Sequence, residues 1–241
     1  MTISNRGKNR ILALLLSLSL ILTMGICAAS PAMAATAASV SKYNTVAKPV
    51  VDDFRANYDG SPADKIVGRG IWYMEYGFMK YGHTKYATTG YIDCSNFVSL
   101  VYKDFGYPVT SACRNYNQVG TKVSGVYVKN GVMYGTDKLR PGDIFTFQRT
   151  TYISHVAMYV GMYKGKPCFI GTTKGFPTCI GIVRGFDNWY GDQFHSVRRV
   201  LPDSAYKTTT KITANGPVIP AKYQIKPTQT IVMPSKLRTG F

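Results

Sequence analysis

Apolar residues recur at helical spacing directly after Cys94 and form one face of a predicted helix. The residues of this face are Phe97, Val98, Val101 and Phe105. Gly106 supplies a helix-ending signal, and Pro108 prevents the helix from continuing. The pattern therefore predicts a helix over residues 94–105, with Cys94 in its first turn.

A second helix is predicted upstream from its start signal. Ser61 is a favourable N-cap, Pro62 fits the first helical position, and Asp64 follows three residues after the cap. The helix should end near Tyr81-Gly82. One side of it would carry Ile66, Tyr73, Met74 and Phe78, which we interpret as core residues.

From residue 144 onward, short β-type runs replace the helical pattern, with Gly, Lys and Pro between them. The predicted strands cover residues 144–147, 155–161, 167–173, 180–186 and 196–201. We expect them to form an antiparallel meander. Helices followed by strands indicate an α+β fold in which N-terminal helices, including the Cys94 helix, pack on an antiparallel β-sheet.

The remaining segments carry weaker patterns. Residues 35–60 are small and polar with one short amphipathic piece, and are predicted to be a lead-in. Residues 109–138 predict a long loop with a short helix or strand. After residue 202 Thr, Lys and Pro dominate, so residues 203–241 are predicted to be a poorly ordered basic tail. Residues 61–202 are predicted to form one domain.

The first 34 residues have the pattern of a secretory signal peptide. Arg6, Lys8 and Arg10 precede an apolar run over residues 11–27, and Ala32-Met33-Ala34 follows with small residues at a cleavage site. Two alternatives remain open, a lipid anchor on Cys27 and an uncleaved membrane anchor. With cleavage we expect a secreted or wall-associated bacterial protein without a stable membrane anchor.

The chain is strongly basic, which indicates an anionic partner. Its net charge is +17, and removing the three basic residues of the signal segment leaves +14 on the remaining 207 of 241 residues. For an exported protein the candidates are wall teichoic acids, anionic lipid surfaces and peptidoglycan carboxylates, and not nucleic acid. The alternative is that the charge serves only solubility.

Four cysteines lie beyond the signal segment: Cys94, Cys113, Cys168 and Cys179. Cys168 and Cys179 fall in neighbouring strand-like segments, so a disulfide between them is one option in an oxidising compartment. No spacing resembles a zinc site, and we expect neither a metal nor a cofactor.

Cys94 and His155 are the candidate nucleophile and general base. The unpaired amides and dipole of a helix N-terminus stabilise a thiolate, although a small buried cysteine at a helix start is the simpler interpretation. His155 opens a predicted strand 61 residues later, from 94 to 155, and the small Ala157 on its face would leave room for a helix. His83 and His195, in a loop and at a late strand, are weaker candidates.

Several motifs occur together in one order and resemble the NlpC family of bacterial cell-wall cysteine peptidases. These are Asp93-Cys94-Ser95, Leu139-Arg140-Pro141-Gly142-Asp143-Ile144 and Ser154-His155-Val156-Ala157-Met158-Tyr159-Val160-Gly161. The region that the resemblance covers also includes Asn117-Gln118-Val119-Gly120 and Arg198-Arg199-Val200-Leu201. The resemblance spans about residues 61–201. It implies a papain-like α+β fold and hydrolysis of amide bonds in peptidoglycan stem peptides.

The resemblance also implies roles for single residues. Cys94 would be the nucleophile, with its backbone amide in the oxyanion hole, and His155 the base that later protonates the leaving amine. Asp93 and Ser95 would line a substrate subsite, or alternatively cap the helix. A substrate-binding tyrosine about a dozen residues before the cysteine corresponds best to Tyr81, and less well to Tyr86.

Two positions depart from the family pattern. Asn96 stands where the family usually has glycine, which a helix tolerates. Gly171 stands where a third polar residue normally orients the catalytic histidine. Thr172 is the substitute we assign to that catalytic role, and Thr173, a backbone carbonyl or a water are the alternatives.

These features predict a secreted cysteine endopeptidase that cleaves peptidoglycan stem peptides. Gly171 favours a second possibility, a catalytically weak wall-binding protein that retains the fold. A third is an acyl transferase that uses the same Cys/His pair, since a thioester intermediate can pass to an amine or alcohol instead of water.

Overall fold

A computed structural model describes residues 36–76, 80–83, 91–210 and 212. The predicted signal peptide, Phe78, Tyr86 and most of the predicted tail lie outside these residues. None of the helices in the described ranges has both the length and the apolar character needed to cross a membrane.

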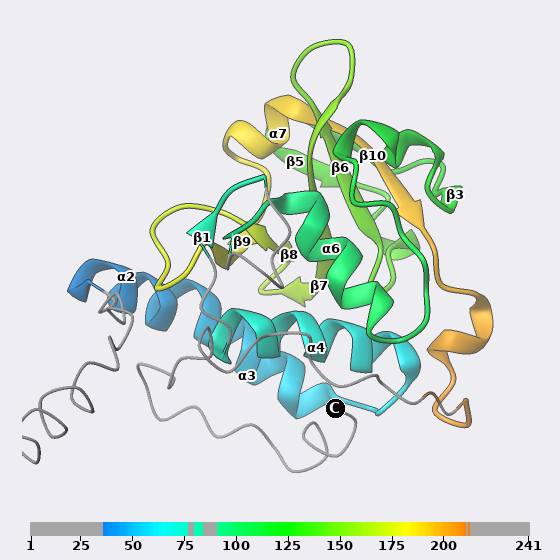
Figure 1. Ribbon diagram of the computed structural model, residues 1–241, viewed down its shortest axis with the longest axis horizontal. Helices are drawn as coiled ribbons and strands as arrows, with labels where there is room; N and C mark the ends of the chain where they lie inside the picture. Colours follow the sequence, from blue (N-terminus) through cyan, green and yellow to red (C-terminus); the bar gives the residue numbers. More distant parts are fainter. Residues whose placement is uncertain (1–35, 77–79, 84–90, 211, 213–241) are drawn as a thin grey trace, which may run out of the picture. The chain divides into compact units, whose positions relative to one another are not determined.

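The centre of the fold is a six-stranded sheet with the order β3-β10-β6-β7-β8-β9, and all its neighbours are antiparallel (Figure 1). Its strands are β3 (Thr121–Lys122), β6 (Ile144–Gln148), β7 (Ile153–Tyr163), β8 (Lys166–Thr172), β9 (Ile180–Arg184) and β10 (Phe194–Arg199). Every predicted strand is present. The meander expected from the sequence is confirmed for β6 to β9, but β10 does not follow β9; it pairs with β6 instead.

The hairpin between β7 and β8 fixes the register of the strand that carries His155. Lys164 and Gly165 both have positive φ, 48° and 72°, as a two-residue type I′ turn requires. A bulge lies between Tyr159 and Gly161. On the side of the bulge that is further from the turn, Met158 pairs with Ile170. Continued by one residue, this register places Ala157 opposite Gly171.

Helices cover one face of the sheet, and aromatic residues fill the other. Val156 and Met158 of β7 face a core that they share with α4 (Pro62–Tyr76) and α6 (Cys94–Lys103). Both helices begin at the residues predicted from the sequence. Ala157 alternates to the opposite face, where it contacts a cluster that includes Phe145 and Phe169. The expectation that Ala157 makes room for a helix is therefore wrong.

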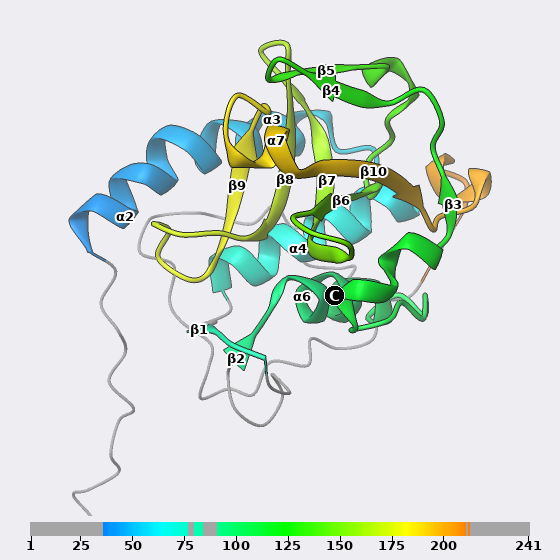
Figure 2. The ribbon, with the colours of Figure 1, turned by 90° about the horizontal axis from the view of Figure 1, so that it is seen from above.

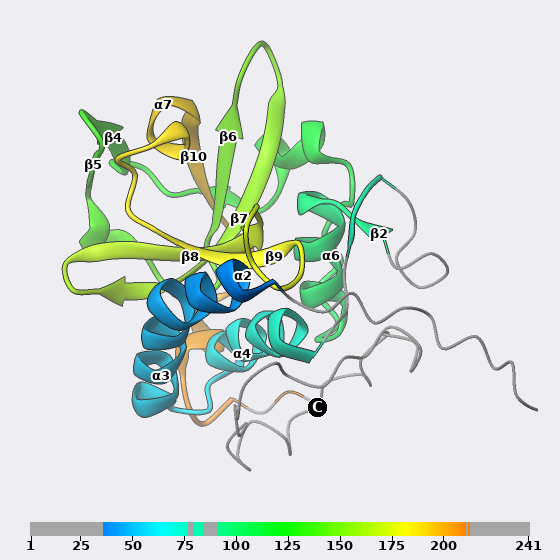
Figure 3. The same ribbon diagram turned by 90° about the vertical axis from the view of Figure 1, so that its left-hand side faces the viewer.

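The lead-in is helical and belongs to the same core. It consists of α2 (Ala37–Lys42), the π-helix η1 (Tyr43–Ala47) and α3 (Lys48–Asn57), and Figure 3 shows α2, α3 and α4 together on one side of the strands. Glu75 of α4 ties them together, because its carboxylate accepts from the Tyr43 hydroxyl at 2.7 Å and from Arg55 at 2.6 Å. The sequence pattern did not predict these helices, because much of the segment is small and polar and only α3 has a short amphipathic face.

Short elements make up the predicted loop and the edges of the domain. They are β1 (Lys80–Tyr81), β2 (Tyr91–Ile92), the 3-10 helix η2 (Cys113–Gln118), β4 (Tyr127–Lys129), β5 (Val132–Tyr134), the 3-10 helix η3 (Thr136–Lys138), α7 (Trp189–Gln193) and the 3-10 helix η4 (Asp203–Tyr206). Figure 2 shows β1 and β2 side by side next to the start of α6, where they form a parallel pair. Because Ala205 of η4 is buried in the main core, the ordered domain extends beyond residue 202.

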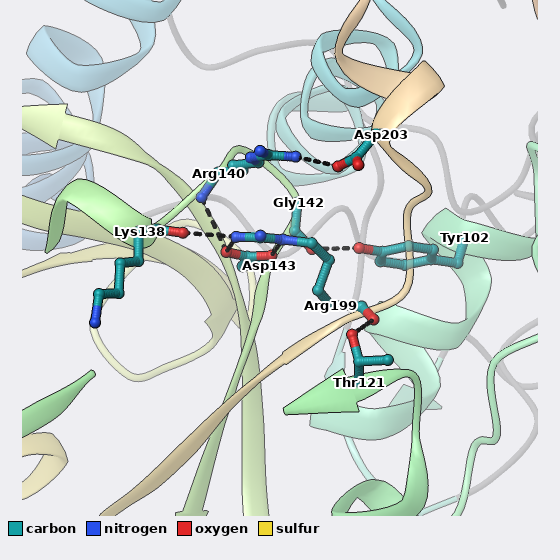
Figure 4. A network of polar contacts seen from close by, with 8 residues as sticks. All are labelled: Tyr102, Thr121, Lys138, Arg140, Gly142, Asp143, Arg199 and Asp203. Carbon is teal, nitrogen blue, oxygen red and sulfur yellow. Dashed lines mark hydrogen bonds and ion pairs between the residues drawn. The ribbon is translucent and has the colours of Figure 1, made fainter. Parts of the chain in front are cut away.

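The turn before β6 is a structural anchor (Figure 4). The side chain of Asp143 is fully buried and accepts two hydrogen bonds from Arg199 of β10, at 2.6 and 2.8 Å, and one from the backbone N–H of Arg140 at 2.9 Å. The Tyr102 hydroxyl of α6 donates to the carbonyl of Gly142. This network accounts for the return of β10 to the edge of β6.

Candidate active site

The start of α6 is held by local hydrogen bonds. Asp93 is the N-cap, and its Oδ1 accepts from the backbone N–H of Asn96 at 2.7 Å. The hydroxyl of Ser95 is buried and donates to the carbonyl of Ser111 at 2.7 Å. Oδ2 of Asp93 lies 3.1 Å from Nδ1 of His83. These contacts agree with the capping interpretation of Asp93 and Ser95.

Cys94 is the first residue of α6, and its surroundings favour the thiolate. Sγ of Cys113 lies 3.9 Å from Sγ of Cys94. The Cys113 thiol, the His155 side chain and the backbone N–H of Val156 together hold the pKa of Cys94 well below its usual range, against burial, which raises it. The residue is only 4% exposed, so the sulfur lies beneath the surface of the site.

Aromatic rings surround the imidazole of His155. Its ring centroid lies 5.5 Å from that of Phe147, 5.7 Å from that of Tyr190 and 6.0 Å from that of Trp189. This packing leaves one ring nitrogen unsatisfied: the buried Nε2 of His155 has no hydrogen-bond partner among the described residues. A buried ring nitrogen without a partner is unfavourable, and it is uncommon in folded proteins.

Thr172 is therefore not seen in the orienting role that the sequence suggested. It ends β8 with its side chain buried, and strand alternation places it on the face of Ile170, with Thr173 on the face of His155. Neither threonine satisfies Nε2. Both nevertheless lie close to the histidine, since they line the same cleft.

The cleft has a volume of about 580 Å³. Its lining residues are Tyr81, His155, Thr172, Thr173, Lys174, Cys179, Trp189 and Tyr190. Tyr81 is exposed on β1, and its pKa is raised by partial burial and then by the nearby Cys94 and Asp93. The structure thus brings Tyr81, Cys94 and His155 into one neighbourhood, whereas Asp93 and Ser95 are not among the residues that line the cleft.

The structure also describes His195, Cys168 and Cys179, the other residues that the sequence singled out. His195 lies 3.2 Å from the Thr146 hydroxyl and 3.1 Å from that of Ser196, away from the cleft. Cys168 and Cys179 are free thiols, and burial raises the pKa of each to about 12. No group of three or more metal-binding side chains is found in the described part of the chain.

Sequence reasoning missed three features of the site. Cys113 gave no spacing signal that would place it beside Cys94, because a turn and a loop separate the two helical segments. Trp189 and Tyr190 lie in a stretch without apolar periodicity, and the only available signal was Asn188, the N-cap that accepts from the backbone N–H of Tyr190 at 2.9 Å.

Residues 79–175 match the model of the NlpC/P60 family, a span that includes both Cys94 and His155. This part of the chain is therefore similar to the NlpC/P60 family. The fold that the resemblance implied, helices packed on an antiparallel sheet, is the fold observed. Comparison with curated proteins finds no match.

Comparison with solved structures finds proteins described as members of this family. An NlpC/P60 family protein from Bacillus cereus ATCC 10987 is 24% identical, with 58% of this chain and 40% of that chain covered and a TM-score of 0.43. A protein from Staphylococcus aureus subsp. aureus Mu50, similar to lipoprotein of the NLP/P60 family, is 20% identical over 59% and 42%, with a TM-score of 0.43. The NlpC/p60 domain of the peptidoglycan hydrolase SagA is 16% identical over 57% and 97%, with a TM-score of 0.39. This chain therefore spans less than half of the first two proteins.

Proposed function

We propose that this NlpC/P60 domain is a secreted cysteine endopeptidase that hydrolyses amide bonds in peptidoglycan stem peptides. The observation that carries the proposal is the position of Cys94 at the start of α6, where Cys113, His155 and the backbone N–H of Val156 lower its pKa. A thiolate that forms at neutral pH is the nucleophile that amide hydrolysis by a cysteine enzyme requires.

In the proposed mechanism Cys94 attacks the scissile carbonyl, and the backbone N–H of Cys94 stabilises the oxyanion. His155 gives a proton to the departing amine, which leaves a thioester on Cys94. His155 then removes a proton from the water that hydrolyses the thioester. Every proton transfer in this sequence uses the ring nitrogen that faces Cys94, so the ring must keep its orientation throughout the cycle.

Aromatic packing is the proposed source of that orientation. Phe147, Trp189 and Tyr190 confine the ring of His155, while no described residue forms a hydrogen bond with Nε2 that could fix the ring. Thr172 would then shape the cleft without bonding the ring. Tyr81 would contact the substrate from the open side, and Asp93 and Ser95 would act indirectly by holding the start of α6.

Charge supports an anionic peptide as substrate. Lys174 is the one Lys, Arg, Asp or Glu among the described residues that line the cleft, and the chain as a whole carries +17. Stem peptides carry free carboxylates, and peptidoglycan is the substrate named for the hydrolase SagA. The same charge would hold the protein on teichoic acids of the wall.

One observation favours a different function, a wall-binding protein with little catalysis. Nε2 of His155 has no hydrogen-bond partner among the described residues, and glycine stands at position 171, where the resemblance implies a side chain that orients the base. Loss of such a partner lowers the rate more reliably than it abolishes the reaction, so we favour the peptidase.

Digestion of purified peptidoglycan, followed by mass analysis of the released fragments, separates the two functions. We expect cleaved stem peptides from the wild-type protein and none from Cys94→Ser, whose hydroxyl is similar in size but a far weaker nucleophile. Circular dichroism of both proteins controls for folding. If wild type and Cys94→Ser are equally inactive but both bind walls, the peptidase proposal fails and wall binding stands.

A further inference from the structure

Two thiols meet beneath the cleft, and the proposed mechanism uses only one of them. Cys113 is the first residue of η2, Cys94 is the first residue of α6, and their sulfur atoms are 3.9 Å apart. Both sulfurs are free. Cys113 is only partly buried, whereas Cys94 is 4% exposed.

We infer that Cys94 and Cys113 form a reversible oxidation site, at which a peroxide oxidises Cys94 and Cys113 then closes a disulfide that removes the nucleophile. The predicted loss of hydrolysis rests on the proposed function, but the disulfide chemistry does not. Cys94 would thereby be protected from irreversible oxidation in the oxidising surroundings of an exported protein.

The chemistry takes two balanced steps. The Cys94 thiolate attacks one oxygen of hydrogen peroxide, so that an S–O bond forms, the O–O bond breaks and hydroxide leaves as water after gaining a proton. Cys94 is now a sulfenic acid and the peroxide has been reduced. The Cys113 sulfur then attacks Sγ of Cys94, the S–S bond forms, the S–O bond breaks, and the oxygen leaves as water with the proton of Cys113.

The geometry needs little adjustment for the second step. The two sulfur atoms already touch, and they must approach from 3.9 Å to a bond length of about 2.05 Å. Rotation about the Cα–Cβ bonds moves a sulfur atom over such a distance. Among the described residues, Cys113 is the one thiol within hydrogen-bonding distance of Cys94.

The electrostatics also order the two steps. In the reduced protein the neighbouring Cys94, followed by burial, raises the pKa of Cys113, whereas the pKa of Cys94 is lowered, so Cys94 ionises at lower pH than Cys113. A sulfenic acid is neutral, so oxidation of Cys94 removes the negative charge that opposes ionisation of Cys113. Cys113 therefore becomes the better nucleophile only after Cys94 has reacted with the peroxide.

The test uses the purified full chain, reduced, treated with hydrogen peroxide and then blocked with N-ethylmaleimide. Trypsin cleaves after Lys103 and places Cys94 and Cys113 on separate peptides, residues 86–103 and 104–114. We expect these two peptides to be linked in the wild type and released by dithiothreitol. Cys179→Ser, which removes the thiol that lines the cleft, should form the same link.

Cys113→Ser keeps a hydrogen-bond donor beside Cys94 but cannot form the disulfide. After peroxide its Cys94 should carry sulfinic or sulfonic acid, and dithiothreitol should restore none of the activity that the wild type regains. Equal overoxidation of Cys94 in wild type and Cys113→Ser, or a link from Cys94 to Cys179, would overturn the inference. A wild type that forms the link but cleaves no peptidoglycan before oxidation refutes the proposed function alone.

Discussion

Gly171 of β8 and Ala157 of β7 lie so close that a Cβ atom added to Gly171 would come within 3.1 Å of Cβ of Ala157. Gly171 is the position at which the resemblance implies an orienting side chain, and the methyl group of Ala157 occupies the space beside it. A side chain at position 171 therefore requires Ala157 to move.

Gly171→Ala should destabilise the folded protein for this reason. Overpacking typically costs about 1–3 kcal/mol, whereas the reduced freedom of the unfolded chain gains about 0.4–1 kcal/mol, so the net loss should be about 1 kcal/mol. Urea unfolding measures it. The double variant Ala157→Gly/Gly171→Ala opens space opposite the new methyl group and should regain part of the loss. A single variant as stable as the wild type would contradict the packing argument.

The reactivity of Cys94 should have a pH profile shifted to low pH. A thiolate persists until the pH falls below its own pKa, and the pKa of Cys94 lies well below the ordinary 9.0, so alkylation by iodoacetamide should continue at about pH 7. Cys168 and Cys179, with pKa values raised to about 12, should react little there. Mass spectrometry of the labelled peptides gives each rate.

Two variants of Cys113 test the cause of that shift. Cys113→Ala removes the donor beside the Cys94 sulfur, so the alkylation profile of Cys94 should move to higher pH. Cys113→Ser keeps a donor and should move it less. Burial slows alkylation equally at every pH, so the quantity to compare is the pH at the midpoint of each profile. Identical midpoints for the wild type, Cys113→Ala and Cys113→Ser would exclude Cys113 as a cause of the shift.

The sequence predicted the elements whose patterns are local. The helix that begins at Cys94 and the strand that begins near His155 followed from apolar spacing and from turn residues, and both are present. The lead-in helices were missed because their stability comes from tertiary contacts such as the Glu75 carboxylate with Arg55, which no local pattern reports.

The site itself was only partly predictable. Cys94 and His155 were identified by residue type, order and resemblance, and the structure places them together. Cys113 and Trp189 approach them only through long-range packing, over separations that carry no periodic signal. The bulge in β7 likewise decides which residue faces Gly171, and bulges are not visible in an alternating pattern.

Arg199 should be a major contributor to stability, because its removal leaves the buried carboxylate of Asp143 without its ion-pair partner. Arg199→Met is expected to lower the free energy of unfolding by about 3 kcal/mol, at the lower end for a broken buried pair. Arg140→Met is the matched control, since the Arg140–Asp203 pair is exposed and should be worth under about 1 kcal/mol. Chemical unfolding of both variants compares them, and equal losses would refute the anchoring role.

Retention on cell walls should depend on salt. Residues 211–241 contain five basic and no acidic side chains, so a chain that ends at residue 210 loses five positive charges. Binding to teichoic-acid-bearing walls should fall as salt rises through physiological strength, where the screening length is about 8 Å, and the shortened chain should show a weaker dependence. Co-sedimentation with walls at several salt concentrations measures both proteins. Salt-independent retention would indicate a specific pocket instead.

The aromatic support of His155 gives the most direct test of how the base is held. If packing orients the ring, Trp189→Leu should lower kcat about tenfold or more while KM changes less, because the ring loses confinement in the transition state. Thr172→Val keeps the shape of the side chain and removes only its hydroxyl, so kcat should stay close to wild type. The reverse result, a loss in Thr172→Val with Trp189→Leu unaffected, would assign the orienting role to the threonine. Equal thermal unfolding curves for the two variants would ensure that the kinetic difference reflects the site and not the fold.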